Sequence, residues 1–161
     1  CRYVRFFVSA PDGDRAAAAT RCAEALAPLS DLAGKRGLTI AIEPGASPLT
    51  QDGAFLTEIM ERLRHPHCRL MPDFGKLRGD IYAGTQAMMP HSVVISAKTH
   101  EFDAAGNEVR TDYRKMLKIV KAAGYKGYVG IEYEGSQLKE AEGIVATKKL
   151  LETVFAEMAK G

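Results

Sequence analysis

The sequence has no long apolar run and no excess of charge of one sign. Its longest apolar runs reach about six residues, whereas a membrane-spanning helix needs roughly 20. Lys and Arg number 22 against 20 Asp and Glu, and no local basic cluster stands out. Nucleic-acid binding depends on such a cluster. The sequence therefore indicates neither a membrane nor a nucleic-acid partner.

Cysteine is also scarce. Cys1, Cys22 and Cys68 are far apart and form no CxxC pair. This pattern excludes a disulfide framework and a zinc knuckle. Free thiols favour a reducing compartment, so we expect a cytoplasmic protein. The chain begins with Cys1 rather than Met, and a strand-like run starts at Tyr3. We therefore expect residues 1–161 to be part of a longer chain.

The sequence does contain a regular alternation of β-rich and helical segments. Strands are predicted at Tyr3–Val8, Leu38–Glu43, Arg69–Asp73, Val93–Ala97 and Tyr128–Glu132. Helices are predicted at Asp14–Lys35, Thr50–Leu63, Asp80–Met88, Tyr113–Ala123 and Leu138–Lys160. A break at Pro28 is left open, since proline suits a helix start better than its interior. Alternating strands and helices predict a parallel sheet covered by helices.

The spacing of the strands fits two α/β architectures. Their ends at Ser9, Glu43, Asp73, Ser96 and Glu132 are separated by 34, 30, 23 and 36 residues. The mean is about 31 residues, which is the repeat of an eight-unit (β/α)8 TIM barrel of about 250 residues. Five units would then be five-eighths of a barrel. A complete five-stranded doubly wound sheet has the same count, so periodicity leaves both open.

Three of the predicted strands end on a carboxylate, at Glu43, Asp73 and Glu132. Side chains alternate along a strand, which puts both glutamates on the side away from the helices. Chemistry in α/β barrels lies at this carboxyl-terminal end of the strands. Three converging carboxylates repel one another, and a divalent cation is the simplest way to keep them ionised. Carboxylate oxygens suit Mg²⁺ or Mn²⁺, and an added imidazole would widen the choice to Zn²⁺ or Co²⁺.

The histidines add little to this cluster. His65, His67 and His91 precede strands and map to the opposite end of the sheet, where stability rather than chemistry is expected. His100 alone follows a strand on the side of the carboxylates.

Four segments of the sequence resemble a known family. They are Ala41-Ile42-Glu43-Pro44, Pro72-Asp73-Phe74-Gly75, Ser96-Ala97-Lys98 and the long stretch Gly124-Tyr125-Lys126-Gly127-Tyr128-Val129-Gly130-Ile131-Glu132-Tyr133-Glu134-Gly135. The family is the sugar phosphate isomerase/epimerase family, within the xylose isomerase-like TIM barrel superfamily that includes AP endonuclease family 2. The resemblance implies a (β/α)8 barrel of which strands four to eight are present. Residues 1–161 would then be the C-terminal part of one barrel domain.

The resemblance also implies one divalent metal ion. Its ligands would be Glu43, Asp73 and Glu132, with Ser96 at the position where the family has a histidine. Many members carry His or Asn where this chain has Lys76. Without the imidazole, Mn²⁺ or Mg²⁺ is favoured, and Zn²⁺ or Co²⁺ stays open.

The implied activity is isomerisation or epimerisation of a sugar or sugar phosphate. Glu43 and Glu132 would move a proton next to a carbonyl, with substrate contacts from Lys98, Lys76, His100 and Arg5. A keto-sugar lyase or hydrolase of the same fold stays open, as does a metal-free carbohydrate-binding relative. The abasic-site endonuclease of the superfamily needs a histidine-rich, multi-metal site, which this sequence lacks.

Five strands taken from a barrel leave two open edges, at Tyr3–Val8 and Tyr128–Glu132. Exposed edges invite pairing with another chain. We therefore expect the isolated 161 residues to be unstable or to form a homo-oligomer.

Overall fold

A computed structural model describes residues 1–10 and 13–160, in which five strands alternate with five α-helices. The strands are β1 (Tyr3–Phe7), β2 (Thr39–Glu43), β3 (Cys68–Leu70), β4 (Val94–Thr99) and β5 (Tyr128–Tyr133). The helices are α1 (Arg15–Lys35), α2 (Gly53–Leu63), α3 (Ile81–Met88), α4 (Tyr113–Ala122) and α5 (Glu140–Lys160). Two short 3₁₀ turns, η1 (Leu49–Gln51) and η2 (Met89–His91), precede α2 and β4.

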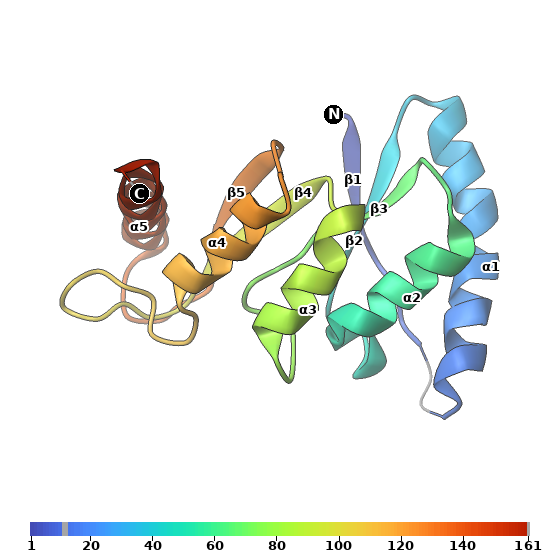
Figure 1. Ribbon diagram of the computed structural model, residues 1–161, viewed down its shortest axis with the longest axis horizontal. Helices are drawn as coiled ribbons and strands as arrows, with labels where there is room; N and C mark the ends of the chain where they lie inside the picture. The colour runs from blue at the N-terminus through green and yellow to red at the C-terminus, as the bar shows by residue number, and fades with distance from the viewer. Residues whose placement is uncertain (11–12, 161) are drawn as a thin grey trace.

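The strands form one curved parallel row in sequence order. β1, β2 and β3 pair in parallel, as do β4 and β5. Single parallel bridges, Leu70 to Ser92 and Asp73 to Ser96, join the two groups. Helices α2, α3 and α4 lie along one side of the strands, with α1 and α5 at the two ends (Figure 1). The predicted parallel sheet covered by helices is confirmed, and the described residues form an incomplete barrel of five βα units.

The alternation of side chains along each strand decides which face carries the core. Ile40 and Ile42 of β2 are buried against the helices, together with residues of α1 and α2. Ile95 and Ala97 of β4 are buried in a second cluster, together with residues of α4 and α5. The opposite face therefore carries the polar partners of these strands, as the sequence predicts.

The predicted bounds agree with the structure to within two residues, except at one end of two elements, where they differ by three. The third strand was expected at Arg69–Asp73 but ends at Leu70, because Pro72 has no N–H to donate to the sheet. Asp73 is still tied to β4, since Ser96 donates its N–H to the Pro72 carbonyl at 2.9 Å. Helix α2 begins at Gly53 rather than Thr50, with the Asp52 side chain accepting from Ala54 N at its start.

Helix α1 runs unbroken through Pro28. Pro28 lies on the exposed face of the helix, while Cys22, Leu26 and Ser30 on the other face are buried. The continuous buried face outweighs the one backbone hydrogen bond that proline removes. Helix α4 is capped by Asp112, whose side chain accepts a hydrogen bond from the N–H of Lys115.

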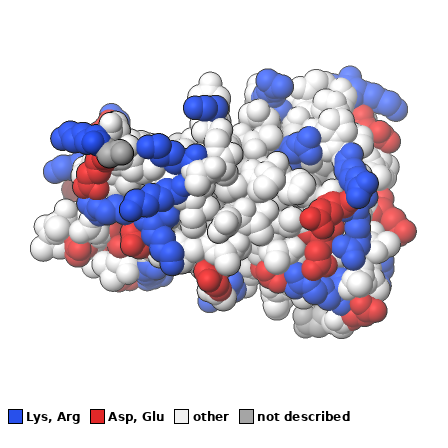
Figure 2. All heavy atoms as spheres, viewed as in Figure 1, with Lys and Arg blue, Asp and Glu red and all other residues white. Residues whose placement is uncertain are grey.

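The described residues contain no helix long and apolar enough to cross a bilayer. On the face seen in Figure 2, Lys and Arg lie beside Asp and Glu at both ends, and the middle is largely uncharged. The two outer strands expose apolar side chains, with Phe6 of β1 and Ile131 of β5 each 37% exposed. Oligomer formation through these edges stays a prediction.

Helices α2 and α3 approach closely at two glycines, and this contact yields a stability test. A Cβ on Gly53 would lie 2.4 Å from the Gly84 carbonyl oxygen, whereas a Cβ on Gly84 would have no atom closer than Leu77 Cδ1 at 3.5 Å, an ordinary contact distance. We expect Gly53→Ala to lower the free energy of unfolding by about 1–3 kcal/mol, because backbone must move. Gly84→Ala is the control and should be neutral or stabilising by up to ~1 kcal/mol. Urea unfolding of both variants tests this, and equal effects would contradict the account.

Candidate active site

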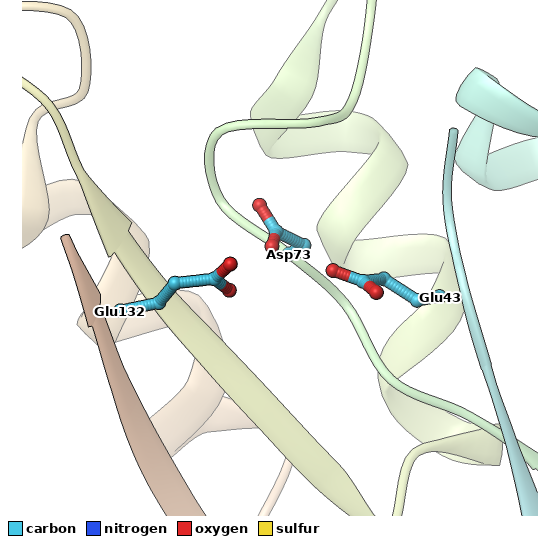
Figure 3. Close-up of side chains that lie close together, drawn as sticks. All are labelled: Glu43, Asp73 and Glu132. Atoms are coloured by element: carbon cyan, nitrogen blue, oxygen red, sulfur yellow. The ribbon is translucent and has the colours of Figure 1, made fainter. Parts of the chain in front are cut away.

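Three carboxylates from separate strands meet at the carboxyl-terminal end of the sheet. Glu43 ends β2, Asp73 follows β3, and Glu132 lies near the end of β5. One oxygen of each lies within 4.8 Å of the others. Figure 3 shows Glu43 and Glu132 pointing toward each other from opposite sides, with Asp73 between them. The convergence that strand ends predicted is therefore present.

Burial makes this cluster electrostatically costly. Glu43 and Asp73 are fully buried, and both Glu43 oxygens and Asp73 Oδ2 lack a hydrogen bond of good geometry. Burial is the main reason that the pKa of Asp73 rises, to about 7, and the neighbouring Glu43 adds to it. Lys98 and the N–H of Gly75 act in the opposite direction. Unpartnered buried carboxylate oxygens call for a cation.

Lys98 supplies one cation from β4. Its side chain is 1% exposed, and Nζ lies 3.5 Å from Asp73, 3.2 Å from Glu132 and 3.0 Å from Glu134. Burial alone would lower the pKa of Lys98, but these carboxylates outweigh burial and hold the pKa above its ordinary value. Lys98 is therefore a protonated ammonium inside the site.

Ser96 orients Glu132. The two side chains share a face because Ser96 and Lys98 of β4 pair in register with Gly130 and Glu132 of β5. Ser96 Oγ donates to Glu132 Oε2 at 2.8 Å. Burial would raise the pKa of Glu132, but the Ser96 hydrogen bond and Lys98 bring it below its ordinary value. Glu132 is thus held as a carboxylate.

Glu43 has cations of its own. Lys76 Nζ lies 3.0 Å from Oε1, and Arg5 of β1 lies 3.5 Å from Oε2. Arg5 thus points to the inner face of the sheet, and Lys76 joins the same cluster.

His100 borders the site rather than entering it. A Cβ on Gly75 would lie 2.8 Å from both His100 Cε1 and Lys98 Cδ, so the imidazole lies beside the Lys98 stem. The His100 N–H donates to Glu108 Oε1 at 3.3 Å. Burial, followed by the charge of Arg110, lowers the pKa of His100. Two other histidines have partners away from the site: His67 Nδ1 bonds to the Leu38 carbonyl at 2.9 Å, and His65 Nε2 lies 3.2 Å from Asp31 Oδ1.

Sequence reasoning missed two acidic residues. Glu134 follows Glu132 by two positions and thus shares its side of the strand, a signal that could have identified it. Glu108 is buried and accepts from the backbone N–H groups of His100 and Thr111, which fixes the loop after β4. No pattern in the sequence distinguishes Glu108 from an ordinary loop acid.

The residues present fit a divalent cation that prefers oxygen. The three acids offer oxygens at short mutual distances, those of Glu43 and Asp73 include buried atoms without a hydrogen bond, and no imidazole is among them. Ser96 is engaged with Glu132 as a donor, which makes it an orienting residue in this structure. An all-carboxylate set suits Mg²⁺ or Mn²⁺ better than Zn²⁺.

A family model described as "Xylose isomerase-like TIM barrel" matches residues 1–154. The chain belongs to the xylose isomerase-like TIM barrel family. The resemblance carried by the four sequence segments is thereby confirmed. No curated protein matches the chain.

Solved structures with this TIM barrel fold resemble the chain at low sequence identity. A D-tagatose 3-epimerase-like protein has a TM-score of 0.79 and 14% identity, over 99% of this chain and 64% of that one. The IOLI protein, solved with a zinc atom, has a TM-score of 0.77 and 19% identity, over 97% of this chain and 63% of that one. A xylose isomerase-like TIM barrel protein from Mycobacterium smegmatis, in complex with magnesium, has a TM-score of 0.62 and 18% identity, over 92% of this chain and 52% of that one. The chain therefore spans less than two thirds of these relatives.

The raised pKa of Asp73 predicts how stability depends on pH. Its ordinary value is 3.8, so the metal-free folded state binds a proton that the unfolded state has lost between about pH 4 and pH 7. Stability from this group is complete below pH 4 and is lost as pH rises through about 7, a change on the order of 4 kcal/mol.

Asp73→Asn should abolish most of this loss, so the metal-free variant gains stability relative to wild type at pH 8 but not at pH 4. Urea unfolding at both pH values, with a chelator present, measures the difference. Glu24→Gln, at an exposed site on α1, is the control. An Asp73→Asn variant with the same pH slope as wild type would refute the assignment.

Proposed function

We propose that the chain carries the metal-binding and proton-transfer part of a sugar isomerase or epimerase active site. In this proposal residues 1–161 are the C-terminal part of one barrel domain. The observation that carries it is the convergence of Glu43, Asp73 and Glu132, in which Glu43 and Asp73 have buried oxygens without a hydrogen bond. The D-tagatose 3-epimerase-like neighbour supports a sugar as the substrate class.

Glu43, Asp73 and Glu132 would hold one Mg²⁺ or Mn²⁺. When bound, such an ion polarises a carbonyl and lowers the energy of negative charge on its oxygen. Glu43 and Glu132 approach from opposite sides of the cluster, as Figure 3 shows. This arrangement suits removal of a proton on one face of a carbon and its return on the other.

Lys98 would stabilise the oxyanion that forms when the proton leaves. Its ammonium is buried and fixed by three carboxylates, so little reorganisation is needed when charge develops nearby. Ser96 would keep Glu132 in place through its hydrogen bond. His100, beside Lys98, would contact a substrate hydroxyl.

A metal-free sugar-binding protein is the second candidate. One observation favours it: Lys98, Lys76 and Arg5 already bring three positive charges to the acidic cluster. A protein of this kind would bind sugar without moving a proton.

Titration of the full-length natural protein with Mn²⁺ separates these candidates. We expect one ion per chain in wild type and an affinity at least about ten-fold weaker in Glu132→Gln, since one of three anionic ligands becomes neutral. Glu24→Gln should bind like wild type.

Solvent exchange gives the matching readout of proton transfer. In D₂O, wild type with a panel of ketoses should incorporate deuterium next to the carbonyl, and Glu132→Gln should not. Sugar binding with neither metal uptake nor exchange would support the second candidate and contradict the first.

A further inference from the structure

The loop between β4 and α4, residues 100–112, contains a small hairpin of its own. Phe102 and Glu108 form an antiparallel bridge, and the Asp103 N–H donates to the Asn107 carbonyl at 2.9 Å. The Asp103 side chain accepts in turn from the Asn107 N–H, at 2.8 Å. These bonds within the loop fix where Glu108 lies relative to the end of β4.

Glu108 places a buried carboxylate between the two ends of this loop. Its side chain is 1% exposed. Oε1 accepts from the His100 N–H at 3.3 Å, and Oε2 accepts from the Thr111 N–H. The loop therefore closes on one negative charge. Strands added at either edge of the sheet would increase this burial and not reduce it.

The His100 imidazole is the basic group beside this charge. Its Nδ1 lies 4.0 Å from Glu108 Oε1, and among the described residues no Lys or Arg forms an ion pair with Glu108. An unprotonated Nδ1 would place a lone pair near a buried carboxylate oxygen, which is unfavourable. A proton on Nδ1 would instead place the positive end of an N–H dipole there. The geometry therefore favours the Nδ1–H tautomer.

The tautomer matters because the imidazole is neutral. Burial, followed by the charge of Arg110, lowers the pKa of His100 from its ordinary value of 6.5. A neutral imidazole has one donor nitrogen and one acceptor nitrogen, so a proton on Nδ1 makes Nε2 the acceptor. The ring lies beside the Lys98 stem, and a Cβ on Gly75 would lie 2.8 Å from Cε1, the carbon between the two nitrogens.

We propose that Glu108 is a positioning residue of the active site. It holds the neutral His100 imidazole in the Nδ1–H tautomer, and Nε2 then accepts a hydrogen bond from a substrate hydroxyl. This inference rests on the proposed function, because it takes His100 to contact the substrate of that site. The opposite tautomer would present a donor at Nε2. Glu108 therefore determines which kind of hydrogen-bonding group the substrate meets.

Nuclear magnetic resonance of the full-length natural protein tests the tautomer directly. With ¹⁵N-labelled histidine and Mg²⁺ at pH 8, long-range ¹H–¹⁵N spectra distinguish a protonated ring nitrogen from an unprotonated one. The His100 signals are identified by their loss in His100→Ala. We expect a protonated Nδ1 in wild type. In Glu108→Gln the population should shift toward the Nε2–H form that predominates in free histidine.

Two further variants show whether the charge of Glu108 is the cause. Glu108→Asp keeps the carboxylate and should retain the Nδ1–H tautomer at least in part. Glu101→Gln is the matched control, because Glu101 belongs to the same loop but pairs with Arg110. This control should leave the tautomer of His100 unchanged.

Deuterium exchange with the ketose panel shows whether Glu108 acts through His100. We expect Glu108→Gln to lower kcat/KM for exchange by about ten-fold in wild type and to have no further effect in His100→Ala. A residue that only stabilises the loop would lower exchange by the same factor in both backgrounds.

The proposal would be overturned by an unprotonated Nδ1 in wild type, by a tautomer that is the same in wild type and Glu108→Gln, or by equal losses of exchange in both backgrounds. The wild-type spectrum decides the tautomer even if Glu108→Gln does not fold. Failure of the proposed function is recognised separately. Wild type would then show no exchange, while a tautomer that depends on Glu108 would still support its role in orienting His100.

Discussion

The site depends on one constraint: buried carboxylates that face one another must be compensated by positive charge. Parallel strands deliver Glu43, Asp73 and Glu132 to the same end of the sheet, two of them fully buried. Left alone they would repel, and Asp73 shows this in its raised pKa. Lys98, Lys76 and Arg5 neutralise part of this negative charge. The oxygens of Glu43 and Asp73 that accept no hydrogen bond are those that a divalent cation would bind.

The chemistry of the site follows from which residue stands at each strand end. Ser96 donates a hydrogen bond to Glu132, so this position orients a carboxylate instead of adding a nitrogen ligand. Lys98, two residues later on the same face, brings an ammonium to the remaining oxygens. The site is thus built from oxygen donors and fixed cations, which favours hard metal ions and substrates that develop negative charge.

Much of this was predictable, because strand periodicity and side-chain alternation are local properties of the sequence. They placed Glu43 and Glu132 on the inner face and Arg5 beside them, and the structure agrees. The early end of the third strand could have been predicted, because Pro72 has no N–H to donate to the sheet. The intact helix at Pro28 was not predictable, since tertiary packing decides it. Nor was the sharing of Lys98 among three acids, which needs the register between β4 and β5. The position of His100 beside Lys98 depends in turn on the absence of a side chain at Gly75.

The central claim is that the three carboxylates bind one cation together. A crystal of the full-length natural protein soaked with Mn²⁺ tests it through anomalous scattering. The account predicts one peak at about 2.1 Å from an oxygen of each of Glu43, Asp73 and Glu132, with Lys98 beside it rather than in its place. No peak, with the Lys98 ammonium still between Asp73 and Glu132, would contradict the account.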